Sequence, residues 1–249
     1  MMSAEKKLAR DEAMKKNLLL MLLVSPLLWA KHPGNFPQAK KVATTIFQKH
    51  QTTLYCQCNY DSDKSVDLNS CHMDDAVNLP RSQRMEWEHM MPASKFGNNL
   101  ACWQQNLCTD NKGKAYKGRR CCEKIDKNFQ KMEGELFNLW PSDGLVNASR
   151  SNFTYAQLYP IVQSRSHDFH GCPVVVDVNN HLFEPSDASK GTVARAMLFM
   201  AEHYDIEIDS ELYNLMTYWH RRFPPSDWEK SWDQAVAEIE GFHNPYIVA

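Results

Sequence analysis

Residues 84–92 read Arg-Met-Glu-Trp-Glu-His-Met-Met-Pro, and this stretch decides how the rest of the chain is interpreted. Polar and apolar residues alternate up to His89, which predicts a β-strand that ends before Pro92. Glu88 and His89 are neighbours, so on a regular strand their side chains point to opposite faces. They can serve one site only where the strand bends, and the approach to Pro92 is such a place.

The chemistry of this pair suits hydrolysis. A neutral histidine can accept a proton from water, and a carboxylate binds hard cations such as Mg²⁺. Taken alone, however, a Glu-His pair is more typical of a half-exposed strand. Other features of the chain must therefore support a site.

A second candidate element lies further along the chain. Apolar residues recur at helical spacing between positions 129 and 139, which predicts a helix that ends before Trp140. Asn138 lies on the polar side of this helix end, where its amide oxygen could bind a cation. An asparagine is also common at helix C-termini for conformational reasons alone. The residues leave both interpretations open.

A basic segment stands between these two elements. Eight lysines and arginines fall between positions 110 and 131, against the three acids Asp110, Glu123 and Asp126. Such a run can neutralise the phosphates of a nucleic acid, although it can equally be only a solvated surface. The basic residues are Lys112, Lys114, Lys117, Arg119, Arg120, Lys124, Lys127 and Lys131.

Residues 1–30 have the pattern of an export signal. Lys15 and Lys16 precede an apolar run that ends at Ala30, and Lys31 restores polarity. The run is shorter than the roughly 20 residues that a membrane span needs. We therefore expect residues 1–30 to be removed on export, with Met14 as an alternative start, and residues 31–249 to form the mature domain. A core helix or an uncleaved anchor is the alternative.

The charge balance limits how the protein can bind a polyanion. The whole chain has a net charge of −2, and residues 31–249 keep 23 basic against 27 acidic residues. A global basic field is therefore excluded, and any phosphate-binding surface must be local. A hydrophobic content of 43% and an aromatic content of 11% also exclude a disordered chain.

All eight cysteines follow the predicted signal, and an even number in an exported chain indicates disulfides. Zinc binding is the alternative. The Cys56/Cys58 and Cys121/Cys122 pairs argue against it, because they lack the C-x-x-C spacing of most structural zinc sites. The cysteines are Cys56, Cys58, Cys71, Cys102, Cys108, Cys121, Cys122 and Cys172.

No internal repeat or interdomain linker interrupts the mature chain, so the patterns predict one α+β domain. Residues 98–127 are expected to be a long loop held by cysteines. Short β-compatible runs occupy residues 53–58, 65–68 and 174–178. Helical spacing covers residues 37–51, 188–204, 210–222 and 227–240, with Gly241 ending the last helix.

Taken together, these stretches resemble the bacterial endonuclease I family of periplasmic and secreted nucleases. The resemblance extends from roughly residue 35 to residue 246, almost the whole mature chain. It is carried by residues 84–93, Phe96-Gly97, Cys102-Trp103-Gln104, Lys131-Met132-Glu133, Asn138-Leu139, Pro141-Ser142, Val146-Asn147, Arg150, Asn152-Phe153, Ala194-Arg195, Asp227-Trp228-Glu229 and His243-Asn244-Pro245-Tyr246.

The family resemblance implies a ββα-metal core, also called the His-Me finger, surrounded by helices and disulfide-bonded. It implies an exported endonuclease, periplasmic or secreted, that uses Mg²⁺ or Mn²⁺ to cleave DNA, and RNA as well, with little sequence preference. The mature form would be a monomer without a membrane segment.

The resemblance also assigns roles to residues. His89 would be the general base, and Glu88 and Asn138 the direct metal ligands. Arg119, with Arg120 as its alternative, would stabilise the transition state. The residues expected to contact the substrate are Arg120, Lys112, Lys114, Lys117, Asn147 and Arg150.

The chain departs from the family pattern at several positions. Phe137 replaces a histidine that usually precedes the metal-binding asparagine, and Leu145 replaces a glutamate. An insertion before Arg119 is flanked by additional cysteines. Comparison with the family therefore implies a Cys108–Cys121 bridge beside an older Cys102–Cys122 bridge. The pairing of the other four cysteines stays open.

Three rival hypotheses remain. The first is an exported binding protein that has lost catalysis through the changes at Phe137 and Leu145. The second is a different metallohydrolase built on His167, His170 or His203, although no carboxylate stands at the spacing that zinc hydrolases use. The third, a purely structural disulfide protein, would leave the Glu-His and arginine pairs unexplained.

Overall fold

The alternating stretch around Trp87 forms a strand, β3 (Met85–His89), in the computed structural model, which describes residues 32–158 and 169–248. β3 pairs antiparallel with β6 (Leu139–Asp143), and His89 lies opposite Leu139. Helix α7 (Gly144–Arg150) follows β6 directly and packs against both strands. The predicted export signal lies outside the described residues.

The prediction of one helix up to Leu139 is wrong. Helix α6 (Lys127–Glu133) ends at Gly134, and after a 3₁₀ turn, η3 (Leu136–Asn138), the chain enters β6. A Cβ at Gly134 would lie 2.9 Å from the backbone oxygen of Pro33, so this close approach needs a glycine. Leu139 is buried as the first residue of a strand.

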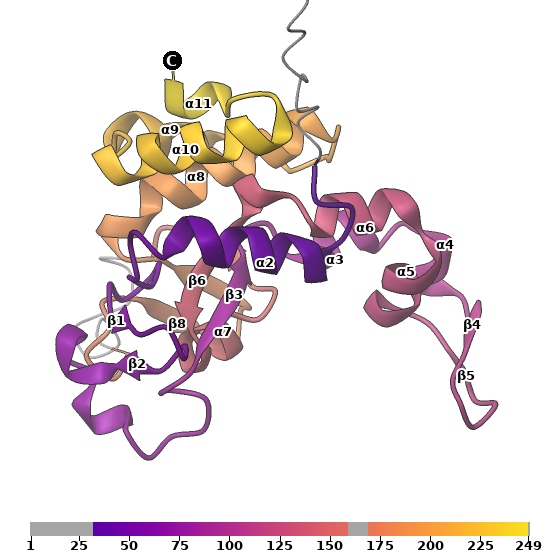
Figure 1. The fold of residues 1–249 in the computed structure, drawn as a ribbon, viewed down its shortest axis with the longest axis horizontal. Coiled ribbons are helices and arrows are strands. Elements are labelled where there is room, and N and C mark those ends of the chain that lie inside the picture. The colour runs from indigo at the N-terminus through magenta and orange to yellow at the C-terminus, as the bar shows by residue number, and fades with distance from the viewer. Residues whose placement is uncertain (1–31, 159–168, 249) are drawn as a thin grey trace, which may run out of the picture. The chain divides into compact units, whose positions relative to one another are not determined.

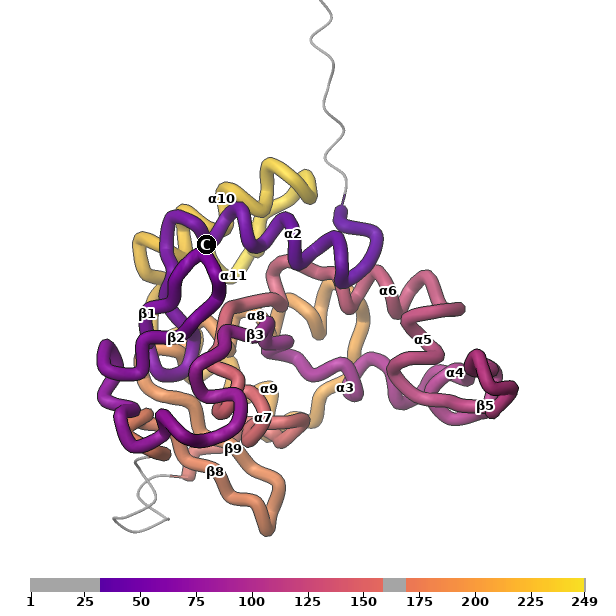
Figure 2. The backbone as a smooth tube through the Cα atoms, turned by 60° about the horizontal axis from the view of Figure 1, so that its bottom comes forward, coloured from indigo at the N-terminus to yellow at the C-terminus, as the bar shows by residue number. Residues whose placement is uncertain are grey.

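The C-terminal helices confirm the predicted helical periodicity. They are α8 (Asp187–His203), α9 (Ser210–Arg222) and α10 (Asp227–Glu240), followed by the short α11 (Pro245–Val248). Gly241 ends α10 with a φ of 86°, as the sequence indicates. Figure 1 shows these helices gathered on one side of the β3–β6 pair. Helix α2 (Phe36–Phe47) lies along α10, and Figure 2 shows the same neighbourhood from another direction.

The cysteine-rich segment contains more regular structure than the expected loop. It forms α3 (Ala93–Gly97), α4 (Ala101–Gln104), a hairpin of β4 (Cys108–Thr109) and β5 (Ala115–Tyr116), and α5 (Arg119–Ile125). Bridges Cys102–Cys122 and Cys108–Cys121 tie this segment together, which confirms the expected pairing.

The remaining four cysteines form the bridges Cys58–Cys71 and Cys56–Cys172. The first closes a loop that contains β1 (Asn59–Tyr60), β2 (Val66–Asp67) and the 3₁₀ turn η1 (Leu68–Cys71), and a second turn, η2 (Asp74–Ala76), follows it. The second lies near a small sheet ordered β7 (Thr154–Tyr155), β9 (Leu182–Glu184) and β8 (Val175–Asp177). All eight cysteines are therefore paired.

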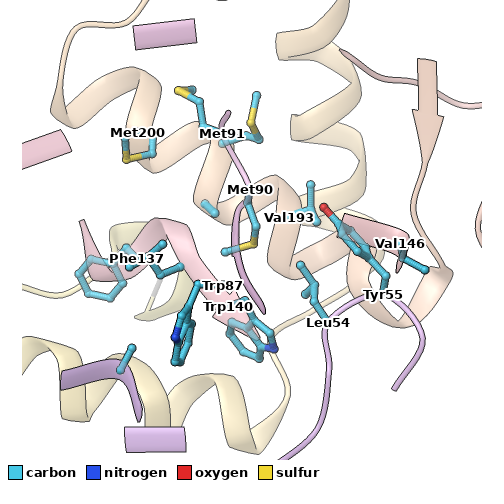
Figure 3. Packing of buried hydrophobic residues seen from close by; sticks show 14 of the residues in the cluster. Leu54, Tyr55, Trp87, Met90, Met91, Phe137, Trp140, Val146, Val193 and Met200 are labelled. Atoms are coloured by element: carbon cyan, nitrogen blue, oxygen red, sulfur yellow. The ribbon is translucent and has the colours of Figure 1, made fainter. Parts of the chain in front are cut away.

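The core joins the strand pair to the C-terminal helices (Figure 3). Phe137 is fully buried, and its ring makes edge contacts with Phe199 of α8 and Trp232 of α10. Removing such a side chain typically costs 3–5 kcal/mol. Phe137 therefore serves the helical core. Within the described residues, no helix is long and apolar enough to cross a membrane.

Candidate active site

A cavity of about 590 Å³ opens at the end of β3. Glu88 and His89 both line it, together with Arg119, Asn147 and Arg150. A larger hollow of about 670 Å³ includes Lys190 but no histidine among its lining residues, and the Lys190 ammonium is paired with Glu184 and Asp187. The smaller cavity is therefore the one that combines a histidine with a neighbouring carboxylate and an arginine.

His89 is held as a neutral imidazole. Its Nε2 lies 2.8 Å from the backbone oxygen of Glu133, and the Phe36 ring packs 4.6 Å from its own ring. Burial, assisted by the positive charge of Arg119, lowers the pKa of His89 to about 3. Because a carbonyl oxygen can only accept, Nε2 carries the proton. Nδ1 is then the nitrogen that can accept one.

Glu88 is almost completely buried beside His89. Its Oε1 accepts a 2.7 Å hydrogen bond from the Tyr55 hydroxyl and lies 3.1 Å from Nη1 of Arg150. Burial raises the pKa of Glu88, and Arg150 and Tyr55 oppose that rise. Its Oε2 makes no hydrogen bond to any described residue.

Arg150 does not have the free guanidinium expected of a substrate contact. Only 1% of the residue is exposed, and its two terminal nitrogens donate to the backbone oxygens of His89 and Met90 at 3.1 and 2.6 Å. The guanidinium also lies 4.6 Å from the centre of the Tyr155 ring. We conclude that Arg150 fastens the end of β3 and compensates the charge of Glu88.

Asn138, the expected metal ligand, is not brought into the cavity. Its Oδ1 accepts from the backbone N–H of Met91 at 2.6 Å, and its Nδ2 donates to the Met91 oxygen at 3.0 Å. The side chain is fully buried. Both polar atoms of Asn138 therefore hydrogen-bond the backbone of Met91 and hold the segment after His89 against the start of β6.

Asn147 lines the cavity instead, from helix α7. Its Nδ2 donates to Oε2 of Glu86 at 3.0 Å, so its oxygen is the atom left to meet a cation. Glu86 also binds the guanidinium groups of Arg81 and Arg84. These hydrogen bonds lower the pKa of Glu86 against the opposing effect of burial, which keeps the carboxylate charged.

Arg119 occupies the first position of α5 and is partly exposed. Its Nε donates to Oε1 of Glu133 at 2.6 Å and to Oε1 of Glu123 at 3.1 Å, and its guanidinium lies over the Phe36 ring. Burial raises the pKa of Glu133 despite the nearby Arg119. Glu133 therefore contacts both His89, through its backbone, and Arg119, through its side chain.

The other predicted basic contacts lie outside the cavity. Lys112, Lys114 and Lys117 are exposed on and beside the β4–β5 hairpin, and Lys117 donates to the backbone oxygen of Gln104 at 3.1 Å. Arg120 is also exposed and lies over the Tyr116 ring. These four residues can meet an extended polyanion only beyond the cavity.

The donor set of the cavity fits a hard divalent cation. A carboxylate oxygen of Glu88 and the amide oxygen of Asn147 are ligands that Mg²⁺ accepts, and the cavity has room for the waters that Mg²⁺ retains. The sequence did not point to Tyr55 or Glu86, because the residues that they contact at the cavity, Glu88 and Asn147, are 33 and 61 residues away.

The histidines of the rival metallohydrolase hypothesis do not form a site in the described residues. His170 is partly exposed and lies 3.4 Å from Asp75, whereas His203 stacks on Phe199 and Phe242. His167 lies outside the described residues. This arrangement gives the rival hypothesis no support.

The chain is similar to known proteins over most of its length. A family model described as Endonuclease I matches residues 37–249. Endonuclease-1 of Buchnera aphidicola subsp. Baizongia pistaciae is 35% identical over 216 residues, covering 86% of this chain and 82% of that protein. An extracellular deoxyribonuclease of Aeromonas hydrophila is 32% identical over 235 residues, covering 93% of this chain and 95% of that protein. A periplasmic deoxyribonuclease of the same species is also 32% identical over 235 residues, with coverages of 93% and 92%.

Proposed function

The chain belongs to the Endonuclease I family, and we propose that it is an exported, Mg²⁺-dependent endonuclease that cleaves DNA and RNA with little sequence preference. The observation that carries the proposal is the cavity shared by Glu88, His89, Arg119 and Asn147. Relatives named extracellular and periplasmic deoxyribonucleases support both DNA as the substrate and a location outside the cytoplasm.

The strand pair and the helix behind the cavity support a ββα-metal core. β3 ends at His89, β6 returns antiparallel beside it, and α7 follows β6 without a linker. This order brings a histidine from a strand end and an amide from a helix to one cavity. We therefore assign β3, β6 and α7 to that core.

His89 acts as the general base that takes a proton from the attacking water. It is neutral at pH 7 because burial depresses its pKa. The Glu133 carbonyl holds the proton on Nε2 and so leaves Nδ1 for the water. A bound phosphate brings negative charge near the ring, which favours the imidazolium that forms as the proton is taken.

Glu88 and Asn147 would hold the cation, and Asn147 replaces Asn138 in this assignment. Glu88 and Asn147 both line the cavity, whereas Asn138 does not, and both of its polar atoms are bound to Met91. A divalent cation bound there supplies positive charge that offsets the charge developing on the phosphate and the leaving oxygen. Burial raises the pKa of Glu88, and the positive charge of Arg150, 3.1 Å from its Oε1, opposes that rise and favours the ionised carboxylate that a cation needs.

Arg119, which also lines the cavity, stabilises the same developing charge. Its guanidinium can bind two phosphate oxygens at once, and its partial exposure allows it to leave Glu123 and turn to the substrate. Lys112, Lys114, Lys117 and Arg120 would contact phosphates further along the strand. Because phosphates carry no base identity, such contacts give little sequence preference.

Nicking of supercoiled plasmid tests the proposal. His89→Ala should lower the rate by roughly 10²–10⁴ while DNA binding persists, because proton transfer contributes about that much. His50→Ala is the matched control, since His50 stacks on Trp228 and does not line the cavity. EDTA should abolish nicking, and structured RNA should be cut under the same conditions.

The ligand assignment is tested separately. Asn147→Ala should lose nicking and regain part of it at high Mg²⁺, whereas Asn138→Ala should chiefly lower the unfolding temperature. If the folded Asn138→Ala protein loses nicking in a Mg²⁺-dependent way and Asn147→Ala does not, the assignment is reversed. If His89→Ala nicks at the wild-type rate, the nuclease mechanism fails as a whole.

A further inference from the structure

Three ionisable residues from distant parts of the sequence meet away from the active-site cavity. His32 precedes α2, Glu135 lies between α6 and η3, and Glu240 is the last residue of α10. His32 Nε2 lies 3.5 Å from Oε2 of Glu135 and 3.9 Å from Oε1 of Glu240. One possible ligand atom from each residue lies within 4.8 Å of the other two.

The two carboxylates have few hydrogen-bond donors for their burial. Glu135 is 0% exposed and accepts from the Phe137 N–H and the Tyr204 hydroxyl, at 3.0 and 2.6 Å. Glu240 is 7% exposed, and its Oε1 accepts only a 3.2 Å bond from the Leu136 N–H. Its Oε2 is buried without a hydrogen-bond partner among the described residues, as is Nδ1 of His32.

Two buried carboxylates so close together cannot both stay ionised without a compensating positive charge. Besides His32, the charged or titratable groups that act on the pair are Lys131 of α6 and His203 and Tyr204 at the end of α8. Burial and the neighbouring Glu135 raise the pKa of Glu240 to about 10, so in the protein alone the pair shares a proton. A divalent cation can replace that proton.

The distances suit such a replacement. Two ligands that bind Zn²⁺ at 2.0–2.2 Å with tetrahedral geometry lie about 3.4 Å apart, close to the 3.5 and 3.9 Å found here. We propose that His32, Glu135 and Glu240 form a second cation site, selective for Zn²⁺-class metals because it offers an imidazole nitrogen. The active-site cavity, by contrast, offers oxygen ligands suited to Mg²⁺.

A cation at this site would be structural. It would join the segment before α2, the turn into β6 and the end of α10 through three short bonds. Phe36, four residues after His32, packs against the imidazole of His89, and Glu135 lies two residues after the carbonyl that holds it. The expected effect is therefore a more stable fold and a more firmly held His89.

The test uses the full mature protein with the Asn147→Ala substitution, which removes one ligand of the proposed catalytic site. After chelation and dialysis, Zn²⁺ is titrated calorimetrically while the thermal midpoint is followed. We expect one saturable equivalent and a rise in the midpoint of roughly 5–10 °C at 100 times the Kd. Binding should release about one proton, seen as a dependence of the heat on the buffer.

Substitutions of the proposed ligands test whether Zn²⁺ binds at this site. His32→Ala and Glu240→Gln should each lose that equivalent and the midpoint rise, and Glu240→Gln should fold well because Gln resembles the protonated acid. His50→Ala should keep both. The proposal is overturned if the equivalent survives His32→Ala and Glu240→Gln, or if Zn²⁺ binds only at millimolar concentrations. The infrared band of a protonated carboxyl that Glu240→Gln removes should disappear at saturating Zn²⁺, and its persistence would also overturn the proposal.

Discussion

Replacing Arg150 by Met should destabilise the protein strongly, because Arg150 neutralises a buried carboxylate. The substitution removes the 3.1 Å ion pair with Glu88 and the hydrogen bonds to the His89 and Met90 oxygens. Removing one partner of a buried pair typically costs 3–5 kcal/mol. For a chain of this size, that cost corresponds to a fall in the thermal midpoint of roughly 6–20 °C.

The penalty should depend on pH with a defined sign. Without Arg150, burial holds the pKa of Glu88 in the folded state further above its value in the unfolded state. The folded state then binds more protons, so the charge-dependent part of the penalty is absent below the unfolded pKa and grows as the pH rises above it, whereas the lost backbone hydrogen bonds cost the same at every pH. Urea unfolding at pH 5 and pH 8 measures this difference.

A double-mutant cycle isolates the charge. Glu88→Gln/Arg150→Met buries no charge, so it should recover much of the loss and show a coupling energy of at least about 1 kcal/mol. The reasoning is refuted if Arg150→Met costs less than about 1 kcal/mol, or if the double variant is no more stable than the single one. Tyr55 should then be regarded as the main partner of Glu88.

Three further predictions concern His89, the Cys108–Cys121 bridge and the β4–β5 hairpin. His89→Asn should make the free energy of unfolding less dependent on pH below 6.5. Because burial lowers the pKa of His89 to about 3, the wild type loses about 1.4 kcal/mol per pH unit as the pH falls below 6.5. Urea unfolding at several pH values checks this. Cys108→Ser/Cys121→Ser should cost about 3 kcal/mol and speed proteolysis of the hairpin, since the bridge closes a short loop; equal cleavage rates would contradict this. Lys112→Gln/Lys114→Gln should reduce the slope of log K for DNA binding against log salt by about 2, and an unchanged slope would show that these lysines do not bind phosphates.

The sequence predicted those parts of the fold that depend on local patterns. Helices α9 and α10 have the expected bounds because caps and apolar spacing agree there. β3 was predicted from its alternation and the following proline. The stretch before β6 was misassigned because the spacing of its apolar residues fits a helix, whereas Gly134 ends α6 where the backbone approaches Pro33.

The site was only partly predictable, for a tertiary reason. Asn138 ends the turn η3 and Asn147 lies in the middle of helix α7, so their local sequence does not show which amide reaches the cavity. Only the β3–β6 register brings Asn138 against Met91, and only the packing of α7 on β3 brings Asn147 to Glu86. Arg150 was expected at the substrate because a sequence does not show which arginine is covered by the fold.

The contacts of Glu133 indicate where the sequence of this enzyme can change without moving His89 and Arg119. Its carbonyl binds the imidazole of His89 and its carboxylate binds the guanidinium of Arg119, so one residue of α6 sets the spacing between these two proposed catalytic groups. The β4–β5 hairpin lies outside this linkage and is closed off by its own bridge. Insertions and deletions at its tip can therefore change the reach along a polymer without altering the geometry of bond cleavage.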